Sequence, residues 1–254
     1  MSKVCGIIGP PATGKTQSAF NTYYEPFDLK ILGLDPKETF YFNPIGKELP
    51  ADNLYREVIF TENGGIVGNK YTNYDPVEIL RVMQFINTIP YIKNIIVDDF
   101  QQIMSNDFFY RRNEIGYEKF AQIGFNAGAI LQYINFMRPD IFVVIMSHTE
   151  EYVENEQRRV KFKTIGKMLD EKMTPEGLFT MLLYAQCTWD EIENKPTYSF
   201  RTTKRFQYDP TRSFLGMFKH EDGKHLYEIP NDLGYIKDSM RKYYTKQAEL
   251  ASVN

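Results

Sequence analysis

Short apolar runs alternate along the chain with segments in which apolar residues recur at helical spacing. The runs that predict buried strands are residues 4–8, 38–43, 94–100, 140–150 and 178–186. Helical spacing predicts helices at residues 17–23, 76–90, 117–137 and 236–249. Strands that alternate with helices are typical of an α/β fold, so we expect a mostly parallel central sheet flanked by helices.

The C-terminal third shows a different pattern. Residues 197–203 alternate as a strand at a sheet edge does, and Asp222-Gly223 predicts a hairpin turn between short strands. Residues 61–75, rich in Gly, Asn and Thr, predict a surface loop or hairpin. Since no repeat or linker interrupts the chain, we expect one domain over 1–254 with a C-terminal helical extension at 235–254.

Residues 9–16, GPPATGKT, satisfy the pattern G-x-x-x-x-G-K-[ST] between a predicted strand and a predicted helix. The glycines let backbone N–H groups point inward, and the helix start adds further N–H groups and partial positive charge. We expect Lys15 to reach the β- and γ-phosphates of a nucleotide and the Thr16 hydroxyl to bind Mg²⁺. The alternative is a glycine-rich turn with a surface lysine. The predicted nucleotide-binding residues are Gly9, Pro10, Pro11, Ala12, Thr13, Gly14, Lys15, Thr16 and Gln17.

Two further strand ends carry polar residues. In open α/β sheets ligands bind at the carboxyl ends of the strands. There Asp98 is expected to hold Mg²⁺ through water, while Asp99 orients or deprotonates an attacking water. A helix N-cap is the structural alternative for these acids. His148 or Ser147 is the candidate for sensing the γ-phosphate, and a purely structural histidine is the alternative.

Composition limits the choice of partners. A formal charge of −3 gives no overall basic field, so any nucleic-acid contact must come from local patches. Cys5 and Cys187 are both expected to be small buried groups, which fits a reducing cytoplasm. No apolar stretch is long enough for a membrane span, so no membrane partner is expected.

Two segments combine charge or aromatic rings in ways that suit nucleic acid. Residues 150–169 concentrate cations in their second half, which indicates a solvated face, a nucleic-acid contact or a contact with a neighbouring subunit's nucleotide. The cations are Arg158, Arg159, Lys161, Lys163 and Lys167. Residues 108–117, FFYRRNEIGY, pair rings with arginines for stacking on single strands, or serve core packing. His220 and His225 lack partners for a metal site.

The motifs GPPATGKT, NIIVDDFQQIM, IMSHTEE and KTIGKMLDEK occur in this order. With them the chain resembles the phage-encoded RecA-like ATPases, also called AAA-family or phage nucleotide-binding proteins, which include Sak-type single-strand annealing ATPases. The resemblance covers residues 4 to about 244, and Asn231-Asp232-Leu233 belongs to it. It implies a RecA-like P-loop fold with a C-terminal β-hairpin and helix, use of ATP with Mg²⁺, and a place in the host cytoplasm.

The resemblance also implies a homo-oligomer, as a ring or filament, in which a Lys or Arg from the next subunit completes the catalytic site. Lys204 and Arg205 are the candidates, and Lys163 and Lys167 compete with them. RecA itself carries a water-activating Glu where this chain has Asn43, so that role passes to Asp99. Lys15, Asp99, His148 and Lys204 are therefore the predicted catalytic residues.

The leading hypothesis is an ATPase that acts with single-stranded DNA in phage recombination or replication, by strand annealing. One alternative is a nucleotide-gated assembly or switch protein with little turnover. Another is a small-molecule phosphotransferase, for which only the 158–167 stretch offers a basic lid.

Overall fold

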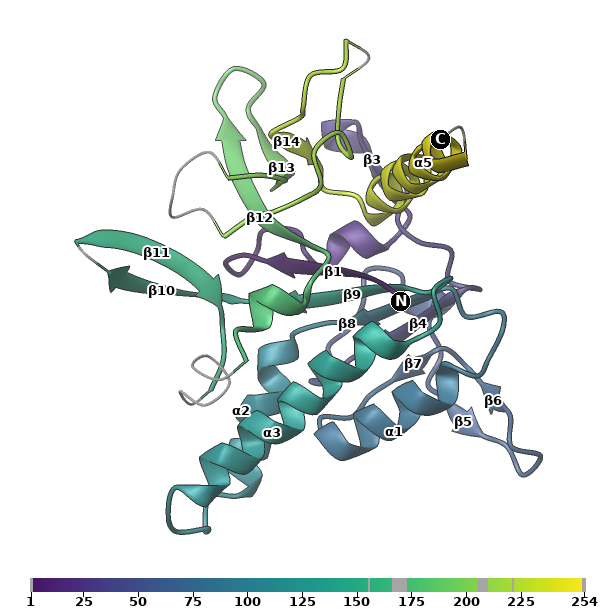
Figure 1. Cartoon of the computed structure of the whole chain (residues 1–254), viewed down its shortest axis with the longest axis vertical. Coiled ribbons are helices and arrows are strands. Elements are labelled where there is room, and N and C mark those ends of the chain that lie inside the picture. Colours follow the sequence, from purple (N-terminus) through teal and green to yellow (C-terminus); the bar gives the residue numbers. More distant parts are fainter. Residues whose placement is uncertain (1, 155, 166–172, 205–209, 221, 253–254) are drawn as a thin grey trace.

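The computed structural model describes residues 2–154, 156–165, 173–204, 210–220 and 222–252. Its largest element is a sheet of eight strands in the order β14-β13-β12-β1-β9-β8-β4-β7 (Figure 1). Pairing from β12 to β7 is parallel, whereas β13 and β14 are antiparallel. The strands are β1 Lys3–Ile8, β4 Thr39–Phe42, β7 Lys70–Tyr71, β8 Asn94–Val97, β9 Phe142–Ser147, β12 Met181–Asp190, β13 Lys195–Arg201 and β14 Glu228–Pro230.

Helices cover both faces of this sheet. They are α1 Pro76–Ile86, α2 Phe100–Tyr110, α3 Glu118–Tyr133 and α5 Leu233–Ser252. One hydrophobic cluster joins the sheet to α1, α2 and α3, and a second joins it to α5. Because both faces are covered, every residue of β8 and β9 is buried. The predicted α/β fold with a mostly parallel sheet is confirmed.

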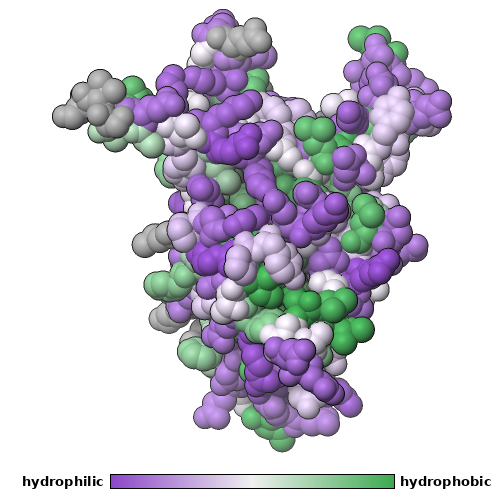
Figure 2. All heavy atoms as spheres, turned by 90° about the vertical axis from the view of Figure 1, so that its right-hand side faces the viewer, coloured by the Kyte–Doolittle hydropathy of each residue, from purple (hydrophilic) through white to green (hydrophobic). Residues whose placement is uncertain are grey.

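Shorter elements surround the sheet. The small antiparallel pairs are β2 Thr22–Tyr24 with β3 Leu29–Ile31, β5 Ile59–Phe60 with β6 Ile66–Val67, and β10 Thr149–Glu154 with β11 Gln157–Phe162. The 3-10 helices are η1 Gln17–Ala19, η2 Glu25–Phe27, η3 Asp52–Leu54, η4 Ile134–Phe136 and η5 Pro175–Leu178. In Figure 1 the β10–β11 hairpin projects away from the sheet. Figure 2 shows a mostly hydrophilic side of the molecule, with hydrophobic side chains gathered in its lower half.

The helix predicted at residues 17–23 is wrong beyond its first turn. Only the single turn η1 forms, and Thr22 already begins β2. The chain returns so closely that a Cβ atom on Gly33 would lie 2.4 Å from the Phe20 carbonyl carbon. The Leu34 N–H then binds the Ala19 carbonyl at 2.9 Å, which is the acceptor that a longer helix would have used.

Most of the C-terminal region is as predicted, but β13 lies between β12 and β14, so the edge position predicted for this strand is wrong. Lys219 and His225 form one antiparallel bridge at the expected turn, and α5 covers the predicted helix at 236–249. Cys5 is buried, but Cys187 is exposed, so its predicted burial is wrong. Residues 187–189 of its strand, β12, are exposed, because the last part of this long strand extends past the core.

Candidate functional site

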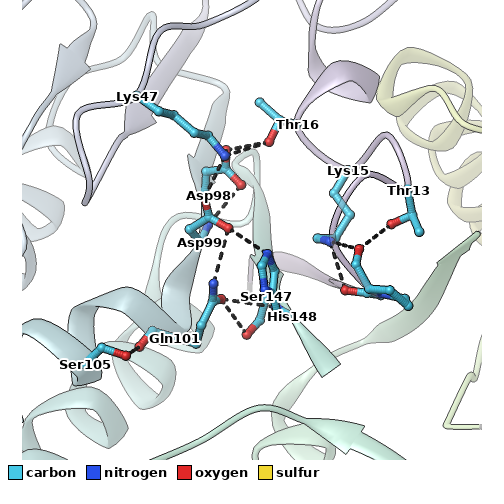
Figure 3. Close-up of polar contacts among 12 residues, drawn as sticks. Thr13, Lys15, Thr16, Lys47, Asp98, Asp99, Gln101, Ser105, Ser147 and His148 are labelled. Carbon is cyan, nitrogen blue, oxygen red and sulfur yellow. Dashed lines mark hydrogen bonds and ion pairs between the residues drawn. The ribbon is translucent and has the colours of Figure 1, made fainter. Parts of the chain in front are cut away.

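The sheet order brings three segments together at the carboxyl ends of neighbouring strands. Strand β9 lies between β1 and β8, with Ile8 opposite Ser147 and Val97 opposite Ile145. All three strands are parallel, so the segments that follow them leave the sheet at the same end. The phosphate loop, the two acids and His148 therefore gather there, as the sequence predicted (Figure 3).

The phosphate loop, residues 9–16, has a backbone that only small residues permit. Gly14 has a φ of +77°, and a Cβ atom there would lie 3.0 Å from the Tyr198 ring. Asn231 donates from Nδ2 to the Thr13 carbonyl at 3.1 Å, and the Thr13 hydroxyl donates to the Pro10 carbonyl at 2.9 Å. The loop is therefore held from outside by the start of the C-terminal segment.

Lys15 is turned toward its own loop (Figure 3). Its Nζ donates to the carbonyls of Gly9 at 2.9 Å and Pro10 at 2.6 Å, and the residue is only 6% exposed. Burial lowers the pKa of Lys15 to about 8, although the charges of Asp98 and Asp99 oppose that shift. The ammonium is thus charged near neutral pH and needs only a rotation of its side chain to face an anion.

The helix contribution to this loop is smaller than the sequence suggested. Because η1 is a single turn, it adds little macrodipole. The positive potential at the loop must come from its own N–H groups and from nearby lysines.

Asp98 follows β8 and is 1% exposed. Its Oδ2 accepts hydrogen bonds from the Thr16 hydroxyl at 2.8 Å and from the Tyr41 hydroxyl at 2.7 Å. The Lys47 ammonium lies 2.8 Å from the same oxygen. Burial and the Asp98 charge raise the pKa of Tyr41 well above its ordinary value, so the phenol stays a hydrogen-bond donor.

Asp99 stands at the N-cap position of α2 but makes no capping hydrogen bond. Its carboxylate instead contacts Lys47 Nζ at 2.6 Å, Gln101 Nε2 at 3.3 Å and His148 Nε2 at 3.4 Å. Burial alone would raise the pKa of Asp99, yet the hydrogen bond and charge of Lys47 outweigh burial and lower it. The side chain is ionised at neutral pH and faces the cavity, so capping does not describe it.

His148 and Ser147 are held together by Gln101. Its Oε1 accepts from the Ser147 hydroxyl at 3.0 Å and from the His148 N–H at 3.1 Å. Burial, together with Lys15, Lys163 and Lys47, lowers the pKa of His148 against the opposing charge of Asp99. The imidazole is therefore neutral at pH 7.

Lys15, Asp99 and His148 line a cavity of about 550 Å³, a volume typical of small-molecule sites. Its polar lining includes residues 13–17, Lys47, Asp99 and His148. Apolar and aromatic side chains complete much of the rest of the lining. They are Tyr24, Phe27, Leu29, Ile31, Pro196 and Tyr198.

The hydroxyl oxygen of Thr16 and the carboxylate of Asp98 fit Mg²⁺. This ion typically takes one or two carboxylates, phosphate oxygens and water, rather than a full cage of protein ligands. The Thr16 hydroxyl and Asp98 lie 2.8 Å apart, and a cation, the Lys47 ammonium, already lies against both. No group of three or more His, Cys, Asp or Glu side chains suited to a metal occurs in the described ranges, which is compatible with such an open site.

Other predicted residues are not in this cavity. Lys204 is exposed just beyond β13, and Lys163 is exposed after β11; neither is among the described residues that line the cavity. Arg205 and Lys167 lie outside the described residues. A role for any of them in a neighbouring subunit stays a prediction.

The sequence reasoning missed four residues that build the site: Tyr41, Lys47, Gln101 and Asn231. The sequence held a signal for three of them. Gln101 lies in the motif NIIVDDFQQIM, and Asn231 begins Asn231-Asp232-Leu233, which also belongs to the resemblance. Tyr41 lies on a predicted strand. No signal in the sequence pointed to Lys47 except its position, four residues after Asn43, the last residue of the predicted strand 38–43.

No family model and no curated protein matches the sequence. Among solved structures, the chain is similar to a KaiC-like protein from the hyperthermophilic archaeon Pyrococcus horikoshii OT3, with 12% identity, 82% of each chain covered and a TM-score of 0.43. The chain's own sheet order shows an α/β fold with a mostly parallel sheet, and the sequence motif of residues 9–16 lies at the carboxyl end of its strand β1. Within the described part of the chain, no helix is long and apolar enough to cross a membrane.

Proposed function

We propose that this chain binds ATP together with Mg²⁺ and hydrolyses it. The observation that carries the proposal is the contact of Thr16 with Asp98 at 2.8 Å, at the mouth of a loop whose lysine is charged near neutral pH. Neighbouring apolar walls offer room for a base and ribose beside the phosphates. Nucleotide binding would use both the polar and the apolar lining of this cavity.

In the proposed reaction Lys15 rotates from its loop carbonyls toward the β- and γ-phosphates. Thr16 and Asp98 would hold Mg²⁺, which when bound neutralises phosphate charge. Asp99 would accept a hydrogen bond from the attacking water and hold it in line with the γ-phosphate. Its ionised state at neutral pH suits that task. Neutral His148, 3.4 Å from Asp99, would respond to the γ-phosphate in this scheme.

We also propose single-stranded DNA as a partner, through the corner between α2 and α3. Three aromatic side chains there are largely exposed: Phe109 at 64%, Tyr110 at 76% and Tyr117 at 71%. Exposed rings beside a cation are the elements of sequence-independent binding to single strands. Arg112 is the exposed cation here, since Arg111 pairs with Asp107 and Glu114. Phe109 and Tyr117 each touch the packed pair of Phe108 and Phe120, with ring centroids 5.8 and 6.1 Å apart, yet both keep most of their surface exposed.

The proposal extends to a homo-oligomer in which Lys204, or another cation, reaches the next subunit's nucleotide. Exposure of Lys204 just past the end of β13 is compatible with that role. Phage recombination or replication by strand annealing is the process that the family resemblance suggests for it.

Phosphate release from Mg·ATP, measured with and without single-stranded DNA, tests this function. We expect basal release that rises when DNA is added, and we expect the Phe109→Ala/Tyr110→Ala double variant to keep the basal rate but lose the increase. A nucleoside acceptor that accelerates ATP use in place of DNA would instead support a phosphotransferase. No release by the wild-type protein, despite binding of Mg·ATP, would indicate a nucleotide-gated switch.

A further inference from the structure

Lys47 holds the position that a metal ion would take. Its Nζ lies 2.9 Å from the Thr16 hydroxyl, 2.8 Å from Asp98 Oδ2 and 2.6 Å from Asp99 Oδ2 (Figure 3). These three oxygens include both groups proposed to hold Mg²⁺. A divalent ion and this ammonium have overlapping sets of ligands, so they cannot both lie there.

The backbone that carries Lys47 is built to place it. After β4 the chain makes a tight turn in which the Gly46 N–H donates to the Asn43 carbonyl at 3.1 Å, with Gly46 at a φ of +66°. Asn43 then donates from Nδ2 to the Lys47 carbonyl at 2.8 Å. Asn43 is 1% exposed, so the anchor of this turn belongs to the core.

Charge explains why a cation belongs at this point. Asp98 and Asp99 are buried neighbours, and two carboxylates so close repel each other unless a positive charge offsets them. Lys15 does not contact them, because its ammonium is bonded to the loop carbonyls. Lys47 therefore supplies the compensating charge in the nucleotide-free protein, and the side chain, 30% exposed, also lines the cavity.

We propose that Lys47 is a tethered cation that excludes a free divalent ion from Asp98 and Asp99 until a nucleotide brings one. Thr16 and Asp98 would hold that ion, so the Lys47 ammonium would have to give up its contacts to them. Metal and nucleotide binding are coupled as a result, since each favours the same displacement of Lys47. The inference rests on the proposed function, because it assigns the metal to the nucleotide site.

Direct binding of Mn²⁺ to the nucleotide-free protein, followed by electron paramagnetic resonance at one fixed pH, tests this inference. Mn²⁺ prefers the same oxygen ligands as Mg²⁺ and is detectable. Lys47→Met removes the charge and keeps the length of the apolar stem. We expect Mn²⁺ to bind this variant about tenfold or more tightly than it binds the wild-type protein, a coupling of ordinary size. Adding Asp98→Asn to the variant should abolish the gain.

Lys70→Met is the matched control. Lys70 is also a partly buried lysine paired with a carboxylate, Asp52, at 2.7 Å, but it lies outside the cavity lining. This variant should bind Mn²⁺ as the wild-type protein does. If Lys47→Met fails to fold, Lys47→Gln keeps a hydrogen-bond donor without the charge and should show the same gain.

Equal Mn²⁺ affinity in the wild-type protein and a folded Lys47 variant would overturn the inference. A parallel titration with Mn²⁺ and ATP together keeps it distinct from the proposed function. If the variant gains Mn²⁺ affinity but neither protein binds the nucleotide, the exclusion of a divalent ion by Lys47 is supported and the proposed function fails. If both proteins bind the nucleotide with the same Mn²⁺ requirement, the inference fails and the function survives.

Discussion

The phosphate-loop site and the β10–β11 hairpin both bring cations together, but the structure surrounds those cations differently. In the site, Lys15 bonds to loop carbonyls and Lys47 bonds to two buried acids around a cavity. In the hairpin, Arg159 pairs with Glu154 at 2.8 Å and Lys161 lies 3.8 Å from Glu150, on a surface that extends away from the sheet.

Strand register explains the hairpin. Residues 158–161 look basic along the sequence, but β11 pairs with β10, which carries Glu150, Glu151 and Glu154. In this register Glu150 lies opposite Lys161, and Glu154, opposite Gln157, pairs diagonally with Arg159. Acids on β10 thus offset much of the positive charge of β11. A run of like charge in the sequence predicts a charged surface only when its strand partner is known.

The largest effect should come from Asp99→Asn in the site. The amide cannot act as a base and would lose the charge that Lys47 contacts, while the fold of the phosphate loop is untouched. We expect the rate of ATP hydrolysis to fall about 10²- to 10⁴-fold with nucleotide binding retained. Phosphate release under single-turnover conditions, with binding measured separately, distinguishes the two effects.

A normal hydrolysis rate in Asp99→Asn would remove Asp99 from the reaction. Arg159→Ala in the hairpin is the matched comparison, because it also breaks an ion pair but lies away from the cavity lining. Its hydrolysis rate should equal that of the wild-type protein.

Gly14→Ala should have the next largest effect. A left-handed φ of +77° strains any residue with a Cβ atom by about 1–2 kcal/mol, and the new atom would press on Tyr198 and Asn231. We expect lower stability in urea unfolding and about tenfold or more weaker nucleotide binding. Gly64→Ala is the control, since Gly64 has a φ of +74° with no atom within 4 Å, and it should lose stability without losing affinity.

Some elements of the fold follow from local sequence pattern, whereas others depend on contacts that are distant in the sequence. The strands β8 and β9 and the helices α1 and α3 are strongly periodic and buried, so local pattern was enough for them. The first helix was not predictable, because its length depends on contact with the returning chain at Gly33 and Leu34. Tertiary contacts override local propensity at such places.

For the site, motif spacing predicted the loop, Asp98 and Asp99, and their proximity follows from sheet order. Lys47 was not predictable, since its position depends on the turn that Asn43 and Gly46 build after β4. Neither residue belongs to a motif with a known mechanism. Only the structure therefore identifies Lys47 as the residue that offsets the negative charges of the buried acids.

Nucleotide binding should depend on pH through Lys15. Burial lowers its pKa to about 8 in the nucleotide-free protein, and phosphate binding favours the charged form. The affinity should therefore be full well below pH 8 and fall about tenfold per pH unit above it. Titrations of a fluorescent nucleotide at pH values from about 7 to 9.5 measure this, since phosphate charge is constant in that range. A flat profile would show that Lys15 does not carry the charge that binds phosphate.

The smallest effect should come from the hairpin itself. Breaking the pair of Arg159 and Glu154 should change the free energy of unfolding by less than about 1 kcal/mol, because the pair is solvent-accessible. A double-mutant cycle with Glu154→Ala measures the coupling. Affinity for single-stranded DNA should change less in Arg159→Ala than in Phe109→Ala/Tyr110→Ala, and the opposite order would move the proposed DNA surface to the hairpin.

The most direct test of the central claim is calorimetric titration of Mg·ATP into the wild-type protein and into Lys15→Ala. The claim is that a nucleotide's phosphates bind the loop of residues 9–16, with Mg²⁺ held by Thr16 and Asp98. It predicts saturable binding of one nucleotide per chain that needs Mg²⁺ and weakens about 100-fold or more without Lys15, a charged donor to phosphate. Equal binding by the two proteins, or none by the wild-type protein, would contradict the claim.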